Sequence, residues 1–388
     1  MEYTSFQRVI TALEHKEPDR VPIDLGGTAV TGINIHALRV LKEYLGIPGP
    51  VQLKDIITQL AVTDDATFES LDLDVRCVGP CPPSNPGPAK NHGLVGDHYR
   101  LTDEWGMSWQ MPAKGGHYYD LYESPLANAE TVQDAENFPW PDPLDAARYM
   151  GLREAADRVV YDEKKAFILE RMSSGMWEHA MWMTGYEKFF MDMVYNPTLV
   201  HAIMSKILEI KMAYWGRALE VMGNYPLIIS EADDLGGQNG LLISLRMYKN
   251  LIWPYHKKLF DFIKSKAKGK VYIFFHNDGA IYPTLPLLID AGVDIINPWQ
   301  VNCTGMDDTA KFKREFGKDL TIWGGSCDTQ RVLLFGTPDE VRAETRRRIE
   351  ELAGGGGFIF APIHVIQSGV PAENIVAWWE TWQEYRNY

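Results

Sequence analysis

Short apolar runs recur along the chain, and helix-like segments separate most of them. Each run is five or six residues long and rich in β-branched or aromatic residues, which is typical of parallel strands buried on both faces. The runs lie at residues 21–25, 73–78, 166–171, 226–231, 270–275, 293–297, 320–324 and 357–361. Eight such strands alternating with helices predict an α/β fold, a (β/α)8 TIM-type barrel.

A doubly wound open sheet is the alternative architecture. Such sheets often carry G-x-G-x-x-G or G-x-x-x-x-G-K-[ST] after a strand, and neither motif follows any of the runs. The four glycines at 354–357 lie before a run, so we expect a flexible turn there instead of a phosphate-binding loop.

The composition changes once along the chain. Residues 79–145 are rich in Pro, Gly, Trp and Tyr, which predicts loops and short antiparallel strands. No linker, charge block or short repeat divides the rest. We therefore expect one barrel domain over 1–388 with an inserted loop and hairpin region at about 79–145.

Charge and cysteine content exclude several classes of protein. The chain has 388 residues and a net charge of -14, which argues against binding nucleic acid or anionic membranes. No apolar run reaches the length of about 18 residues that a membrane span needs, and residues 1–20 resemble a polar amphipathic helix, not a signal peptide. The four cysteines are too few and too scattered for a disulfide framework. We expect a cytoplasmic enzyme or binding protein.

Polar residues directly after the runs are the candidate functional groups, because a barrel places its chemistry where the strands end. Two of the ten histidines lie there, His276 in FFHNDG and His364 in APIHVIQ. Together with Asp278 they offer nitrogen and oxygen ligands that suit zinc. In the alternative interpretation each histidine bonds a loop carbonyl and each acid caps a helix.

The segment SEADDLGGQ places Glu231 at the end of the run 226–231 and Asp233 and Asp234 directly after it. Three neighbouring carboxylates raise one another's pKa, so a metal, a cation or a bound proton must relieve them. One would be a ligand and another a proton carrier, or an aspartate would be the N-cap of the next helix. The predicted catalytic residues are Asp278, Asp233 and Glu231. The predicted metal ligands are His276, His364, Asp234, Glu231 and Cys327, the last of which could instead pack as a small apolar group, as we expect for Cys303.

Methionine and aromatic residues concentrate at 171–195. The third run is followed by Met172, Met176 and Trp177. These side chains would either pack in the core or line a pocket for a flat, tetrapyrrole-like ligand, to which Gln367, after the last run, would also contribute. Trp105 and Trp109 could contribute to such a pocket or pack the insertion.

Several longer motifs resemble the uroporphyrinogen decarboxylase superfamily, in that family's order and over nearly the whole chain. They are SFQRVITALEHKEPDRVPI, DEWG, DDLGGQ, HNDGAIYPTLPLLIDAGVDIINPWQ, WGGSCDTQRVLLFGTPDEV and GGFIFAPIHVIQSGVPAENI. The resemblance implies a (β/α)8 barrel, in agreement with the count of runs.

The resemblance points away from the decarboxylase branch itself. Those enzymes carry a P-V-W-x-M-R-Q-A-G-R-Y motif after the first strand, whose arginines hold substrate carboxylates. This chain reads VPIDLGGTAVTGINIH there and has no arginine until Arg39. The other branch contains zinc-dependent methyltransferases that work with a corrinoid protein.

Members of that branch that use coenzyme M have H-x-C after strand five and a cysteine after strand eight. Here His276 matches, while Asp278 and His364 stand where the cysteines would be. A harder ligand set suits a metal that polarises an ether oxygen. The resemblance therefore implies methyl transfer from a methoxylated, aromatic small molecule to the cobalt of a corrinoid protein.

Two other functions remain open at this stage. One is a decarboxylase with Asp24, at the end of the first run, stabilising a protonated intermediate. The other is a non-catalytic binder of a tetrapyrrole or corrinoid. Barrels of this kind often pair, so a homodimer is also considered.

Overall fold

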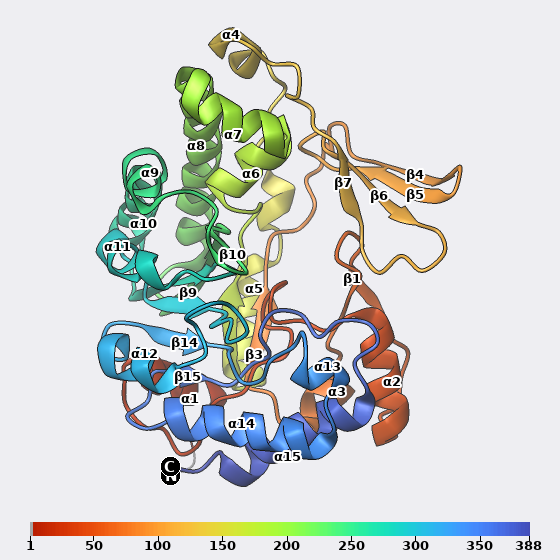
Figure 1. Cartoon of the computed structure of the whole chain (residues 1–388), viewed down its shortest axis with the longest axis vertical. Helices are drawn as coiled ribbons and strands as arrows, with labels where there is room; N and C mark the ends of the chain where they lie inside the picture. Colours follow the sequence, from red (N-terminus) through yellow and green to blue (C-terminus); the bar gives the residue numbers. More distant parts are fainter. Residues whose placement is uncertain (1–2) are drawn as a thin grey trace.

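A computed structural model of the chain describes residues 3–388. Seven parallel strands form its central sheet (Figure 1), and each begins and ends within or next to an apolar run expected from the sequence. In spatial order they are β3 (Val75–Val78), β8 (Ala166–Leu169), β9 (Leu227–Ala232), β12 (Val271–His276), β13 (Ile295–Asn297), β14 (Thr321–Trp323) and β15 (Phe358–Ile359).

The first run supplies the eighth strand segment and closes the barrel. The N–H of Phe360 donates to the carbonyl of Pro22 and the N–H of Asp24 donates to the carbonyl of Phe360, both at 2.8 Å. On the other side, the N–H of Asp74 donates to the carbonyl of Ile23 at 3.0 Å. The segment therefore lies between β15 and β3, and the predicted (β/α)8 TIM-type barrel is confirmed.

Apolar side chains that alternate along the strands fill the barrel, as expected for a closed parallel sheet. Helix α1 (Ser5–Leu13) covers its N-terminal end and adds Val9, Ala12 and Leu13 to this core. The amphipathic helix expected at the N-terminus is therefore present, although residues 1–2 lie outside the described part. The strand residues of this interior cluster are Val75, Ala166, Ile168, Ile228, Tyr272, Phe274, Ile295, Trp323 and Ile359.

Helices surround the barrel (Figure 1). Their starts follow from local sequence: Thr337 and Glu340 form a capping box at α14, and Pro197 begins the 26-residue helix α8. Within residues 3–388, no helix is both long and apolar enough to cross a bilayer. The remaining helices are α2 (Ile35–Leu45), α3 (Asp65–Ser70), α4 (Val132–Glu136), α5 (Leu152–Asp157), α6 (Met176–Thr184), α7 (Tyr186–Tyr195), α8 (Pro197–Met222), α9 (Leu245–Met247), α10 (Trp253–Lys266), α11 (Leu285–Ala291), α12 (Thr309–Phe316), α13 (Val332–Phe335), α14 (Pro338–Leu352) and α15 (Ala372–Tyr385).

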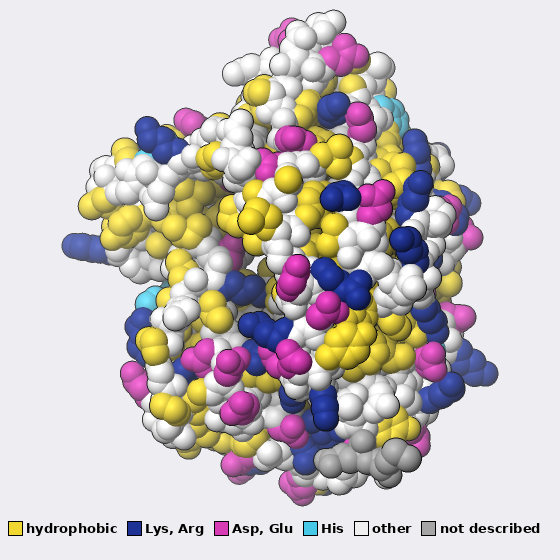
Figure 2. Space-filling model, turned by 180° about the vertical axis from the view of Figure 1, so that it is seen from behind, with side chains coloured by type: hydrophobic (Ala, Val, Ile, Leu, Met, Phe, Trp, Pro, Cys, Tyr) yellow, Lys and Arg dark blue, Asp and Glu magenta, His cyan; other side chains and the backbone are white. Residues whose placement is uncertain are grey.

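The region between β3 and α5 contains the expected insertion, a four-stranded antiparallel sheet that projects from the barrel (Figure 1). Trp109 is buried and packs edge-to-face on Trp182 of α6, with ring centroids 5.5 Å apart, and Trp105 is buried too. Both tryptophans therefore pack the insertion. Hydrophobic side chains are visible on this projecting sheet in the space-filling view (Figure 2). Its strands are β4 (Lys90–Val95), β5 (His98–Thr102), β6 (Ser108–Pro112) and β7 (Asp120–Glu123).

Two short hairpins lie near the C-terminal ends of the barrel strands. One joins β1 (Leu53–Asp55) to β2 (Leu60–Ala61), and the other joins β10 (Gly236–Gly237) to β11 (Gly240–Leu241). The second hairpin begins directly after the acidic segment that follows β9, so it shapes the mouth of the barrel.

Candidate metal centre

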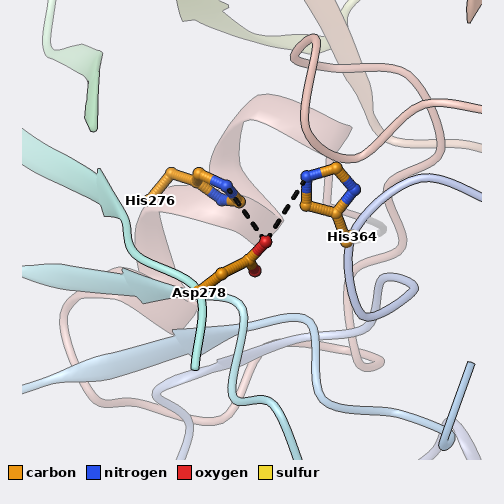
Figure 3. A group of neighbouring side chains, drawn as sticks. All are labelled: His276, Asp278 and His364. Carbon is orange, nitrogen blue, oxygen red and sulfur yellow. Dashed lines mark ion pairs between the residues drawn. The ribbon is translucent and has the colours of Figure 1, made fainter. Parts of the chain in front are cut away.

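Three predicted side chains meet at the mouth of the barrel (Figure 3). His276 is the last residue of β12, Asp278 follows it by two residues, and His364 lies in the loop after β15. The Oδ2 atom of Asp278 is 3.7 Å from Nε2 of His364 and 4.0 Å from Nε2 of His276. One potential ligand atom of each residue lies within 4.8 Å of the others, and no other group of three such residues is found among residues 3–388.

This geometry fits a divalent metal. Zinc bound tetrahedrally at 2.0–2.1 Å holds its ligand atoms about 3.3 Å apart, so small side-chain rotations would bring these three atoms onto one ion. The Oδ1 atom of Asp278 is buried and has no hydrogen-bond partner in the described chain. A buried carboxylate oxygen without a partner is unfavourable, which a cation at this position would relieve.

Asn297 determines which nitrogen of His276 faces the site. Its Nδ2 donates to the carbonyl of Trp323 at 2.7 Å, so its Oδ1 is the atom that lies 2.7 Å from Nδ1 of His276. Nδ1 must then carry the proton and donate it, which leaves the Nε2 lone pair directed at Asp278. Burial lowers the pKa of His276, which favours the neutral imidazole that metals bind.

His364 has a strained backbone. Its φ angle of 59° lies in the left-handed region that side chains other than glycine rarely adopt. Its ring lies 5.2 Å from that of His276, and burial lowers its pKa. Strain of this kind collects at functional sites, where the surrounding structure holds it.

Asp234 lies at the edge of the group. Its Oδ1 accepts a hydrogen bond from the N–H of Asp278 at 2.8 Å and is 4.0 Å from Nε2 of His276. Burial raises the pKa of Asp278 to about 6, and the charge of Asp234 acts in the same direction. The structure thus brings together His276, His364 and Asp234, predicted as ligands, with Asp278, for which both a ligand and a catalytic role were predicted. Asp278 has the position of a ligand.

Glu231 lies outside this group, contrary to expectation. Residues of a strand alternate between faces, so Ser230 points into the barrel while Glu231 points outward toward α8. There it accepts hydrogen bonds from Nζ of Lys211 at 2.9 Å and from Nε1 of Trp215 at 2.6 Å. Its charge is compensated inside the protein, and it is not retained as a ligand or catalytic acid.

Cys327 also lies outside the group. Its buried side chain lies near Thr345 and Glu344 of α14, and burial raises the pKa of the thiol. A thiol that stays protonated in an apolar environment is a poor ligand. Packing, the alternative left open for this cysteine, agrees with its position, and Cys303 is buried as well.

Asp233 caps the N-terminus of α6 from outside that helix, whose own N-cap residue is Gly175, and does not cap the helix that follows it in sequence. Its buried carboxylate accepts hydrogen bonds from the N–H groups of Trp177 at 3.1 Å and Glu178 at 2.7 Å. Nε2 of His256 lies 2.7 Å from its Oδ2. With three partners, this carboxylate has no free oxygen to act as the proton carrier expected from the sequence.

The predicted cofactor-binding residues do not form one open pocket. Met176 and Trp177 are buried, and Trp177 packs edge-to-face against Phe189 at 5.3 Å between ring centroids. Met172 is half-buried against the core, whereas Gln367 is exposed. Core packing therefore describes Met176 and Trp177 better than ligand binding does.

Other polar groups in the mouth were missed by the sequence reasoning. Burial, with the nearby charge of Asp234, raises the pKa of Glu178 well above its usual value, and Ser174 donates a hydrogen bond to this carboxyl. Lys54 comes from the β1 hairpin, and the neighbouring Cys77, Glu170 and Asp24 together raise its pKa. Lys54 neither belongs to a motif nor follows a barrel strand, so no sequence signal identified it. Glu178 lies in the Met- and aromatic-rich segment after the third strand, where only its neighbours Met172, Met176 and Trp177 had been considered.

Asp24 is fully buried at the end of the first strand segment. Burial raises the pKa of its carboxyl to about 6, although Nε1 of Trp323 donates to it at 2.8 Å and the N–H of Gly27 at 2.7 Å. Arg171 is anchored by Ser230, with Nη1 2.5 Å from Oγ, and by Glu170 at 3.2 Å.

We expect Asn297→Leu to weaken zinc binding by about 10–100-fold, the usual effect of removing the partner that orients a metal-binding histidine. Competition with a chelator measures the dissociation constant. Asn196→Ala is the control, because that side chain bonds the carbonyl of Glu130 on the insertion side of the molecule. Equal zinc affinity in Asn297→Leu and the parent would contradict the assigned orientation of His276.

Comparisons with known proteins agree with this architecture. The family model of uroporphyrinogen decarboxylase (URO-D) matches residues 103–385. The chain is 25% identical over 294 residues to the uroporphyrinogen decarboxylase of Psychromonas ingrahamii, covering 72% of this chain and 75% of that enzyme. It is 24% identical over 293 residues to the enzyme of Pseudoalteromonas translucida, with the same two coverages.

A solved structure has a similar fold along its whole length. A methyltransferase from Methanosarcina mazei superimposes with a TM-score of 0.66, and the match covers 99% of each chain. The sequence identity is 17%, so this likeness concerns the fold.

Proposed function

The chain belongs to the uroporphyrinogen decarboxylase (URO-D) family, and we propose that it is a zinc-dependent methyltransferase of that family. Its methyl donor would be a methoxylated, aromatic compound, and its acceptor the cobalt of a corrinoid carried by a partner protein. The observation that carries the proposal is the meeting of His276, Asp278 and His364 at the barrel mouth, with one oxygen of Asp278 buried and without a partner in the described part of the chain.

The chemistry assigned to each residue follows from its position. A zinc ion bound there supplies a Lewis acid for the ether oxygen of the donor. His276, Asp278 and His364 would hold it, Asn297 fixes the tautomer of His276, and Asp234 lies where it could add an oxygen ligand. Glu178 favours its protonated form and lies near Asp234, so it can hold a proton for the leaving oxygen.

The ligand set supports an ether donor over a thiol acceptor. Two imidazoles and a carboxylate form a harder set than one that contains thiolates, and harder sets favour oxygen. The methyl group must pass to its acceptor in line with the bond that breaks, so the acceptor has to dock over the mouth.

Decarboxylation is the second candidate, because the curated relatives named above are decarboxylases. The buried Asp24 would then stabilise a protonated intermediate. Arg171, which follows β8 and could hold a substrate carboxylate, already contacts Glu170 and Ser230. This arrangement favours the methyltransferase proposal.

The test uses the purified full-length chain. Metal analysis should find about one zinc per chain, the stoichiometry of a single three-residue centre. The protein is then mixed with a panel of methoxyphenols and methoxybenzenes and with cob(I)alamin as methyl acceptor, and methylcobalamin is measured by its absorbance. Absence of bound metal, or release of carbon dioxide from carboxylic acids without methyl transfer, would overturn the proposal.

A further inference from the structure

A buried chain of hydrogen bonds links α10 to the mouth of the barrel. His256 on α10 is 1% exposed, and its Nε2 lies 2.7 Å from Oδ2 of Asp233. The hydroxyl of Tyr248 lies 3.1 Å from its Nδ1. When Tyr248 donates to Nδ1, the proton of the imidazole is on Nε2 and is donated to Asp233. Both nitrogens of this buried ring therefore have partners.

Asp233, which His256 holds in place, contacts two parts of the mouth. Its carboxylate holds the N-terminus of α6 through the N–H groups of Trp177 and Glu178. Its own N–H donates to the carbonyl of His276 at 3.0 Å. The next residue, Asp234, accepts the N–H of Asp278 at 2.8 Å and receives Nε1 of Trp177 on its carbonyl at 3.1 Å.

The ring of His256 also supports the strand that carries His276. It lies edge-to-face on Phe275, the residue before His276, with centroids 5.1 Å apart, and parallel to Phe260 on its own helix at 5.8 Å. Asp233 packs closely against the start of α6, because a Cβ on Gly175 would lie 2.0 Å from Oδ1 of Asp233. A small displacement of Asp233 therefore cannot be absorbed without moving α6 or the Asp233–Asp234 turn.

We propose that His256 is a positioning residue for the metal centre. It fixes Asp233, and through it the turn and strand end that place Asp234, Asp278 and His276. A π-helical turn at Tyr248–Ile252 precedes α10 and brings Tyr248 to the outer nitrogen of the ring. Such turns are frequent at functional sites. The inference rests on the proposed function for the identity of the bound metal. It assigns a positioning role to a residue that lies farther from the metal centre than the ligands do.

The experiment compares zinc affinity in the full-length parent and its variants by chelator competition, with the thermal midpoint measured alongside. His256→Phe keeps a ring but removes both nitrogens, and we expect its dissociation constant for zinc to rise about tenfold. His256→Gln, whose amide can still donate to Asp233, should recover most of the affinity. Recovery of affinity by this variant separates positioning from a general loss of packing.

The chain offers a matched control in His179, a second buried histidine, which lies on α6 and has no partner for either nitrogen among residues 3–388. His179→Phe should leave zinc affinity unchanged. If His256→Phe does not fold, Tyr248→Phe decides, because it removes one hydroxyl only and should raise the dissociation constant about threefold, a weaker form of the same outer-sphere effect.

The outcomes separate the inference from the proposed function. Parent-like zinc affinity in folded His256→Phe, or in Tyr248→Phe when the former does not fold, overturns the positioning role and leaves the metal centre intact. Equal loss of affinity in His256→Phe and His179→Phe also overturns it. A parent that shows no zinc binding overturns the proposed function, and the inference with it.

Discussion

Replacing His276 with alanine should reduce zinc affinity by at least about 100-fold, because losing a ligand exceeds the 10–100-fold loss seen for residues that merely orient ligands. Methyl transfer to cob(I)alamin should fall with metal content. The fold should persist, because the alanine keeps the backbone hydrogen bonds between β12 and its neighbouring strand. The imidazole that is removed bonds Asn297 and otherwise faces the mouth of the barrel. Zinc content, chelator competition and the thermal midpoint are measured on the same preparations.

His364→Ala and Asp278→Asn test the same centre from two further elements. Asp278→Asn keeps the shape of the side chain while removing the charge, so a loss of zinc there reports the carboxylate itself. The control is His92→Ala, since His92 is exposed on β4 and bonds Thr102 of the neighbouring strand. Full zinc occupancy and unchanged methyl transfer in all three site variants would contradict the assignment of the centre.

The barrel could be predicted because each strand is buried on both faces, which produces continuous apolar runs in place of alternation. The weakest case is β15 (Phe358–Ile359), where the run GFIFA pairs along two residues before the chain turns toward His364. The apolar run at residues 21–25 also predicted the segment that closes the barrel, although this segment makes a single β-bridge, at Ile23.

The site could be predicted in part for a topological reason. The carboxyl ends of parallel strands meet at one rim, so His276, Asp278 and His364 were expected together despite their separation along the chain. Glu231 was misplaced because the prediction used its position at the end of an apolar run and ignored which face of the strand its side chain lies on. In β9 the residues Leu227, Ile229 and Glu231 share the outward face, while Ile228 and Ser230 face inward.

The remaining residues depend on packing that no local pattern encodes. Lys54 reaches the mouth from a hairpin outside the barrel, and Glu178 depends on where α6 begins. That start is set by Asp233 from another strand and by the close approach of Gly175. Trp177 was placed correctly after strand three, but its burial follows from contacts with α7 that the sequence of α6 alone does not specify.

The second large effect that we expect is on stability. Lys211→Met should lower the free energy of unfolding by about 3–5 kcal/mol, the usual result of removing one partner of a buried ion pair. Lys211 and Glu231 are 1% and 2% exposed, and Nζ lies 2.9 Å from Oε2. Without Lys211, the carboxylate of Glu231 keeps the N–H of Trp215 alone and must be buried with its charge or take up a proton. Urea unfolding measures the difference.

The double variant Lys211→Met with Glu231→Gln distinguishes this cause from a packing defect. Methionine resembles the lysine stem in length, and the glutamine carbonyl can still accept from Trp215, so the uncompensated charge is removed while the shape is kept. We expect it to recover most of the lost stability, and to keep the zinc affinity of the parent because Glu231 faces α8 and not the mouth. Parent-like unfolding of the single variant would contradict the ion pair, whereas loss of zinc in the double variant would return Glu231 to the metal centre.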